Sequence, residues 1–134
     1  MSNTTKVLVC NTSRMHAEPL LDRIEAQIST DVTYCENAER ALELVPTKGP
    51  CIIVTESIIP SAQNLGPSNT EGTLWLLKES KKKNPACKVI LYSVYLADIS
   101  SEDLKGFDYH DNSMRESSYQ ALFNKLRSMT GVTA

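Results

Sequence analysis

The stretch CIIVTESIIP, residues 51–60, decides how we interpret the fold of this chain. Its first half is apolar without polar alternation, which is typical of a strand that is covered on both faces of a sheet. The run then ends at a polar cluster that contains Glu56, and apolar residues resume before Pro60. This order predicts a buried strand with a carboxylate at its carboxyl-terminal tip.

Further strands and helices are predicted on both sides of this stretch. Short apolar or β-branched runs predict the other strands, at residues 6–10, 31–37, 88–94 and 106–111. Apolar residues at three- and four-residue spacing predict helices at residues 17–28, 38–45, 72–83, 100–106 and 116–129. Ser13 is the expected cap of the first helix, and Pro19 suits only its first turn. The alternation predicts an α/β fold, an open parallel five-stranded sheet with helices on both faces.

The carboxyl ends of parallel strands are the expected place for a functional site. Polar residues lie at these ends, at positions 11–13, 55–57, 93–95 and 110–112. Residues 61–72 form a polar loop that is longer than the median connection of ~4 to 6 residues. The sequence has no internal repeat, so we expect residues 1–134 to form a single domain with its core at about 6–130.

Charge and hydropathy exclude two classes of partner. The formal net charge is −2, and the basic run at 81–83 is expected to be a solvated helix end, so no nucleic-acid surface is predicted. No stretch approaches the ~18 to 20 apolar residues of a membrane span, so we expect a cytoplasmic protein without a membrane contact. The four cysteines form no C-x-x-C pair and are expected to be buried free thiols. His16 and His110 lack patterned partners, so no metal site is predicted.

The order of these elements is similar to that of a known family. Five strand–helix units, a third strand followed by two apolar residues and Pro60, and Gly72 opening the third helix resemble the receiver domain of two-component response regulators. The resemblance covers residues 6–130 and implies a doubly wound, flavodoxin-like (βα)5 fold. It also implies phosphoryl transfer, in which an acidic pair after the first strand holds Mg²⁺ and an aspartate after the third strand accepts the phosphoryl group. A Ser or Thr after the fourth strand and a Lys after the fifth then stabilise the product.

This sequence departs from the family pattern at four of its five chemical positions. The acidic pair falls on Asn11 and Thr12, the phosphoacceptor on Glu56 and the lysine on Asn112, whereas Ser93 matches the hydroxyl position. The resemblance therefore implies a degenerate pseudo-receiver that is not an enzyme and needs no cofactor. In such a domain Glu56 is either a strand-end residue, hydrogen-bonded to Thr12 or Ser93, or a permanent mimic of phosphoaspartate.

Three functions are compatible with these residues. The first is a non-catalytic signalling or adaptor module that binds another protein without Mg²⁺-dependent phosphorylation. The second is an atypical receiver that is still phosphorylated through substituted residues, for which the candidate metal ligands and phosphate acceptors are Glu56, Asp108, Asp111, Thr55, Ser57 and Ser93. The third is a receiver gated by a small anion, bound near Ser13 and at helix N-termini under the loop 61–72.

Receiver-like domains bind partners through the face of the fourth helix, fifth strand and fifth helix. In this chain that interaction face contains Tyr95, Leu96, Ile99, Tyr109, His110, Met114 and Tyr119. Tyr109 matches the switching aromatic residue of the family. We expect this face to bind a signalling protein, and it is also the expected face of a homodimer. Because the last predicted helix ends close to residue 134, we expect output through a protein contact.

Overall fold

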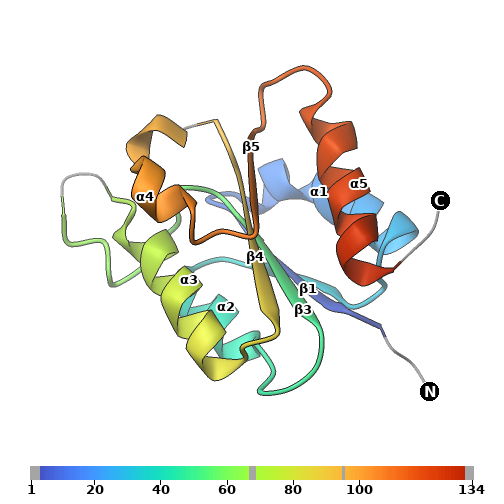
Figure 1. Cartoon of the computed structure of the whole chain (residues 1–134), viewed down its shortest axis with the longest axis horizontal. Coiled ribbons are helices and arrows are strands. Elements are labelled where there is room, and N and C mark those ends of the chain that lie inside the picture. The colour runs from blue at the N-terminus through green and yellow to red at the C-terminus, as the bar shows by residue number, and fades with distance from the viewer. Residues whose placement is uncertain (1–3, 67–68, 95, 132–134) are drawn as a thin grey trace.

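The sheet predicted from the alternating strands is present in the computed structural model, which describes residues 4–66, 69–94 and 96–131 (Figure 1). Its strand order is β2-β1-β3-β4-β5, and every neighbouring pair is parallel. The strands are β1 Lys6–Cys10, β2 Val32–Cys35, β3 Cys51–Thr55, β4 Cys87–Ser93 and β5 Tyr109–Asn112. The predicted doubly wound α/β fold is therefore confirmed.

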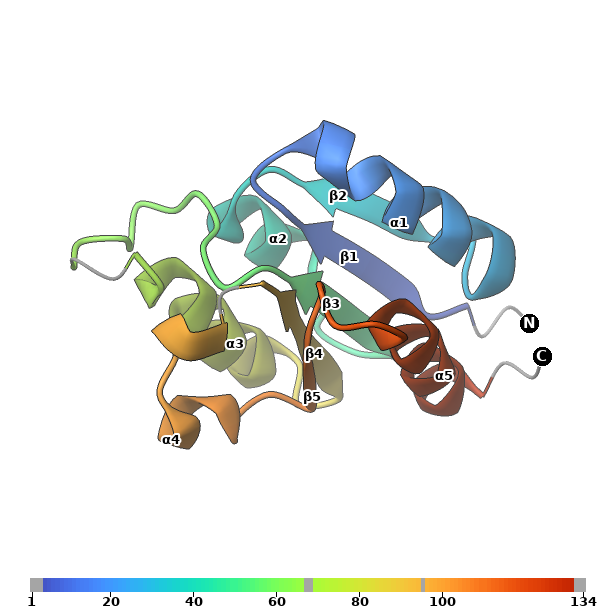
Figure 2. The same ribbon diagram turned by 90° about the horizontal axis from the view of Figure 1, so that it is seen from above.

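Helices cover both faces of this sheet (Figure 2). One face carries α1 Arg14–Gln27 and α5 Ser118–Thr130, and the other carries α2 Ala38–Leu44, α3 Glu71–Lys83 and α4 Ser101–Leu104. A 3-10 turn, η1 Leu96–Asp98, precedes α4. Within the described ranges, no helix has the length and apolar character needed to cross a membrane.

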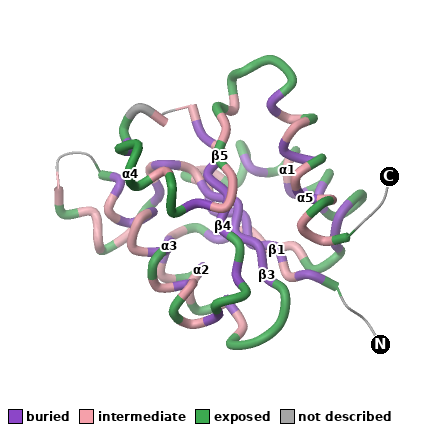
Figure 3. Tube along the Cα trace, in the orientation of Figure 1, coloured by how far each residue is buried: buried purple, intermediate pink, exposed green. Residues whose placement is uncertain are grey.

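The central strands are buried on both faces, which explains their continuous apolar runs. Successive side chains of a strand point to opposite faces. Leu8 and Ile53 pack in the core under α2 and α3, whereas Val9 and Val54 pack in the core under α1 and α5. Figure 3 shows that the buried residues concentrate along β1, β3 and β4. The two cores fix the positions at which these strands end.

The edge strand β5 begins three residues later than the sequence pattern predicts. Phe107, which we assigned to the strand, turns into the core under α3 and is only 7% exposed. Asp108 uses its carboxylate to accept a hydrogen bond from the Val89 amide, 2.7 Å away. The strand itself alternates between half-buried and exposed residues, as expected at a sheet edge with one covered face.

Two predictions about the start of α1 need correction. Ser13 is the N-cap residue of α1, as predicted, but its side chain makes no capping bond, and its amide donates instead to Asn11 Oδ1. Pro19 lies in the second turn of α1, later than its chemistry prefers. The stop of α5 is as predicted, because Gly131 adopts a positive φ of 77° that favours glycine.

The basic run ends α3 as predicted, but two of its three lysines are not simply solvated. Lys81 Nζ contacts Asp108 Oδ2 at 2.8 Å and the Cys87 carbonyl oxygen at 3.1 Å. Lys83 Nζ donates to the Leu42 carbonyl oxygen at 2.8 Å. These lysines therefore tie α3 to the start of β5 and to the end of α2.

Candidate functional site

The polar residues predicted to share a site lie at the carboxyl edge of the sheet. Asn11 follows β1 and Glu56 follows β3, and these two strands are neighbours at the point where the chain changes direction across the sheet. Ser93 ends β4 and Asn112 ends β5, where the two are paired in register. The sheet therefore brings all four positions to one edge.

The side-chain oxygens of Asn11 and Thr12 form local hydrogen bonds. Asn11 Oδ1 accepts from Thr12 Oγ1 and from the Ser13 amide, each at 3.3 Å. The Tyr34 hydroxyl donates to the Asn11 carbonyl oxygen at 3.0 Å. This turn is held by its own bonds, and Thr12 does not make the predicted bond to Glu56.

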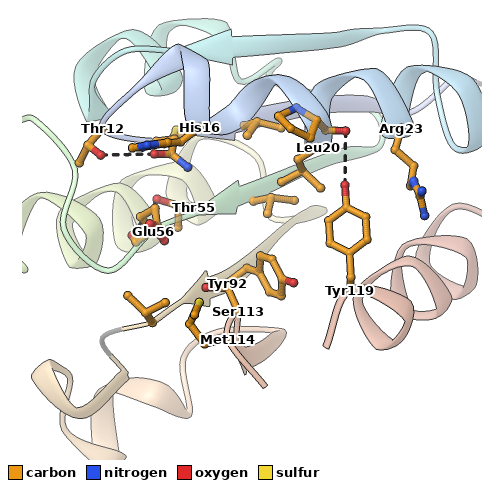
Figure 4. Close-up of a pocket in the computed structure, with 16 residues that line it drawn as sticks. Thr12, His16, Leu20, Arg23, Thr55, Glu56, Tyr92, Ser113, Met114 and Tyr119 are labelled. Carbon is orange, nitrogen blue, oxygen red and sulfur yellow. Dashed lines mark hydrogen bonds between the residues drawn. The ribbon is translucent and has the colours of Figure 1, made fainter. Parts of the chain in front are cut away.

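Glu56 is fixed through its backbone, while its carboxylate faces a cavity (Figure 4). Its amide donates to the Cys10 carbonyl oxygen at 3.3 Å, and its carbonyl oxygen accepts from Thr73 Oγ1 at 3.0 Å. Burial raises the pKa of the Glu56 carboxyl, and a hydrogen bond from Ser93 partly offsets that effect. None of the ion pairs among the described residues involves Glu56. The nearby His16 also lowers this pKa, to a lesser extent, but a half-buried carboxylate without an ion-pair partner is poorly suited to mimic phosphoaspartate.

The hydroxyl groups proposed as phosphate acceptors are buried below the strand tips. Ser57 and Ser93 are both 0% exposed, and their hydroxyl oxygens are 2.9 Å apart. Thr55 Oγ1 donates to the Glu56 carbonyl oxygen at 3.0 Å. Because these hydroxyls bond to one another or to the backbone, none of them is presented to solvent as a nucleophile.

Asn112 occupies the lysine position but bonds to its own loop. Its Oδ1 accepts from the Met114 amide at 2.8 Å, and its side chain is not part of the cavity wall. The preceding Asp111 accepts hydrogen bonds from Arg115 and from the Tyr109 hydroxyl, the latter at 3.0 Å. The Arg115 guanidinium holds the pKa of the Asp111 carboxyl at about 2. Both carboxylate oxygens of Asp111 are therefore engaged.

The residues at the strand tips do not fit a divalent cation. Mg²⁺ requires several oxygen ligands in near-octahedral geometry, and Glu56 is the only carboxylate among the described residues that line the cavity. No group of three histidine, cysteine, aspartate or glutamate side chains with metal-binding geometry occurs in the described part of the chain. The candidate ligands of the alternative receiver, Glu56, Asp108 and Asp111, do not form such a group, because Asp108 lies before β5 and pairs with Lys81.

The predicted interaction face is only partly exposed. His110 is exposed, but Tyr109 and His110 point to opposite faces of the sheet, because they are successive residues of β5. Ile99 does not belong to the surface, since it is only 4% exposed. The remaining members are Met114, which is exposed, and Leu96 and Tyr119, which are half-buried. Tyr95 lies outside the described residues.

A cavity of about 660 Å³ opens between α1, α5 and the tips of β1, β3 and β4. It is not under the loop 61–72, where the third of the functions considered above places an anion, and no described residue of that loop lines it. The residues that α1, β4 and α5 contribute were not predicted to line a cavity, and one of them, Tyr119, was expected on the interaction face. They are His16, Leu20, Arg23, Tyr92 and Tyr119. A signal for the α1 members existed, because His16, Leu20 and Arg23 recur at helical spacing beside the buried stripe.

Comparison with solved structures shows that this is the receiver fold. Response regulator TrrA from Thermotoga maritima, in complex with Mg²⁺–BeF, aligns over 93% of this chain and 98% of its own, with a TM-score of 0.71 and 17% identity. The receiver domain of Francisella response regulator 1452 aligns over 95% and 97%, with a TM-score of 0.69 and 24% identity. A chain in the complex of histidine kinase ThkA with TrrA aligns over 91% and 97%, with a TM-score of 0.66 and 18% identity. No protein-family model and no curated protein sequence matches this chain.

Proposed function

We propose that residues 1–134 form a single signalling domain with the receiver fold that acts through protein contacts and has lost Mg²⁺-dependent aspartyl phosphorylation. The donor set at the strand tips is the observation that supports this most. Asn11 and Thr12 replace an acidic pair and bond to each other, and Asn112 replaces a lysine and bonds to its own loop. Glu56 then remains as a lone carboxylate that cannot hold a dication by itself.

A domain of this kind would transmit its signal by binding another protein. TrrA has been crystallised with histidine kinase ThkA, and its chain has the same fold as this one. We propose that this chain also binds a signalling protein, through exposed residues around β5 such as His110. The same surface is the proposed face of a homodimer.

An NMR titration tests the loss of the phosphorylation site. We expect millimolar Mg²⁺, alone or with beryllofluoride, to leave the amide signals of residues 11–13, 56, 93 and 109–112 unchanged. Saturable shifts at these residues would overturn the proposal. TrrA is the positive control, because its structure holds Mg²⁺–BeF.

A gain-of-function variant makes this test sharper. Asn11→Asp combined with Thr12→Asp restores the acidic pair beside Glu56 without changing the size of the side chains greatly. We expect this variant to bind Mg²⁺ while the native chain does not, because three carboxylates then lie at the tips of the neighbouring strands β1 and β3. If the native chain and the variant bind Mg²⁺ equally, the substituted residues still form a metal site and the proposal is wrong.

A further inference from the structure

The cavity between α1 and α5 has the size and the lining of a small-molecule site. Its volume of about 660 Å³ falls in the range of ~300 to 1,000 Å³ that ligand pockets occupy. Most of its wall is apolar and comes from Val9, Val54, Leu20, Pro19 and Met114. Polar side chains such as Glu56 and His16 interrupt this wall and can orient a ligand.

The two ends of the cavity differ in chemistry (Figure 4). Glu56, Thr12 and His16 lie at one end, at the tips of the strands and the start of α1. Tyr119 lies at the other end, where its hydroxyl donates to the Pro19 carbonyl oxygen at 3.3 Å and joins α5 to α1. Leu20 and Tyr92 line the space between these ends. A ligand that fits this space has a polar head and an apolar body.

The charged residues of the cavity wall indicate the charge of the ligand's polar head. Glu56 is the sole carboxylate in the wall, is half-buried and forms no ion pair with another described residue. The two basic residues, His16 and Arg23, are exposed to solvent, and the Arg23 guanidinium lies 5.1 Å from the centre of the Tyr119 ring. Glu56 is therefore the least solvated charge of the wall. Burial raises the pKa of this carboxyl, and the nearby Ser93 and His16 offset only part of that rise.

We propose that this cavity binds a small organic amine, with its ammonium group against Glu56 and its aromatic or aliphatic body along Leu20, Tyr92 and Tyr119. An ammonium group would place a cation directly against Glu56, which forms no ion pair with another described residue, and would donate a charge-assisted hydrogen bond to it. The apolar body of the ligand would bury the apolar surface of the cavity wall that is exposed to water in the free protein. This ligand differs from the anion of the third function considered from the sequence, which Glu56 would repel.

The inference goes beyond the proposed function, because an amine can bind whether or not a protein partner is present. The cavity wall includes Ser113 and Met114 of the loop between β5 and α5, next to the surface proposed for protein contacts. An amine in the cavity would therefore contact α1, three strand tips and that loop together. Its binding is measured separately from Mg²⁺ binding and from partner binding.

Two pairs of probes that match in shape and differ in charge test the proposal. The amines are phenethylamine and tryptamine, and their carboxylate counterparts are 3-phenylpropionate and indole-3-propionate. In amide NMR titrations of the full chain, we expect the amines to shift residues 9–12, 54–56 and 113–114 saturably, with a dissociation constant of ~1 mM or tighter for at least one of them. The carboxylates should bind at least about tenfold more weakly.

Three variants test how much the Glu56 carboxylate contributes to amine binding. Glu56→Gln keeps the shape of the side chain and should weaken the amines at least about tenfold. Glu102→Gln removes the same charge from α4, where the Glu102 side chain is 84% exposed, and should leave binding unchanged. Leu20→Phe partly fills the cavity and should weaken tryptamine more than phenethylamine.

Three results would overturn the proposal. They are equal or tighter binding of the carboxylates, equal amine binding by the native chain and Glu56→Gln, and the absence of shifts with both amines at millimolar concentration. A Mg²⁺ titration of the same sample keeps the two proposals apart, since shifts with Mg²⁺ would contradict the proposed function and not the amine site. Displacement of a bound amine by millimolar Mg²⁺ would show that Mg²⁺ binds at Glu56, which would contradict the proposed function and leave the amine site in place.

Discussion

Glu56 lies where the protein fold raises the cost of ionising a carboxyl group. Its side chain is half-buried, and the Ser93 hydroxyl replaces only part of the hydration that the carboxylate loses. In the unfolded chain the same carboxyl is solvated and has its ordinary pKa. The difference between the two states makes Glu56 a source of pH-dependent stability.

The Glu56→Gln variant should be at least as stable as the native chain at neutral pH. Because the pKa of Glu56 is raised in the folded state, its favourable contribution is complete below the ordinary pKa of 4.5 and is lost as the pH rises through the folded-state pKa. Gln does not ionise, so the variant avoids this loss. We expect a gain of at most ~1 kcal/mol at pH 7.5, limited by solvent screening, and no gain at pH 4. Urea unfolding at the two pH values measures this difference.

A lower stability of Glu56→Gln at pH 7.5 would show that the ionised carboxylate has a favourable partner in the native chain. The control is Glu102→Gln, which alters an exposed carboxylate paired with Lys105 on α4. This control should change the free energy of unfolding by less than ~0.5 kcal/mol at both pH values.

The positions of most strand-tip residues could be predicted from the sequence, but their side-chain hydrogen bonds could not. Asn11, Glu56 and Ser93 could be located because each directly follows or ends an apolar run of recognisable length. Their hydrogen bonds depend on side-chain rotamers and on the packing of neighbouring strands, which no local pattern contains. Thr12 thus bonds to Asn11 and not to Glu56.

At the scale of elements, the cavity depends on how α1 and α5 are held relative to each other. The Tyr119 hydroxyl bonds to the Pro19 carbonyl, and the Arg127 guanidinium bonds to Gln27 Oε1 at 2.7 Å. Each of these bonds joins residues one hundred positions apart. Helical periodicity predicted both helices, but it contains no information on their separation, so the cavity could not be predicted.

The loop between β3 and α3 is anchored by side chains within it. Asn64 bridges its two ends, because its Nδ2 donates to the Ile59 carbonyl oxygen and its Oδ1 accepts from the Gly72 amide, each at 2.7 Å. Ser61 Oγ donates to Glu39 Oε2 at 2.9 Å and ties the loop to α2. A Cβ atom at Gly72 would lie 2.5 Å from the Ser61 Cβ atom, so only glycine allows this close approach.

The Asn64→Ala variant should therefore destabilise the chain by about 1–2 kcal/mol, because the Ile59 carbonyl and the Gly72 amide lose their partner. Leu65→Ala is the matched control in the same loop. The Leu65 side chain is 89% exposed, and its truncation should change stability by less than ~0.5 kcal/mol. Urea unfolding of both variants measures the difference, and equal values would show that Asn64 does not anchor the loop.

For the whole molecule, the alternation of strands and helices was sufficient to predict the fold. Parallel strands buried on both faces give continuous apolar runs such as 51–55, and such runs need helical crossovers between them. The edge strand β5 was placed three residues too early, because it is short and half-exposed and Phe107 belongs to the core. The ion pair of Lys81 with Asp108 was missed because it joins residues that are distant in sequence.

The four cysteines are distributed across this sheet as two neighbouring pairs. Cys10 lies beside Cys35 in the ladder of β1 and β2, and Cys51 lies beside Cys87 in the ladder of β3 and β4. All four are free and buried, as predicted. A hydrogen bond within each pair, together with burial, raises the pKa of the Cys10 and Cys51 thiols. These two thiols are therefore poor nucleophiles in the folded state.

Thiol modification should consequently report the unfolding of the whole sheet. We expect 5,5′-dithiobis(2-nitrobenzoate) to modify the native chain at least ~10³-fold more slowly than the urea-unfolded chain, because a stable domain rarely exposes its core. Mass spectrometry during the reaction should show unmodified and fully modified chains with few intermediates. Both pairs lie in the core under α2 and α3, so exposing any thiol requires that this core open. Rapid modification of Cys35 alone would instead show that the edge strand β2 separates from β1 without global unfolding, and the sheet would then not open as one unit.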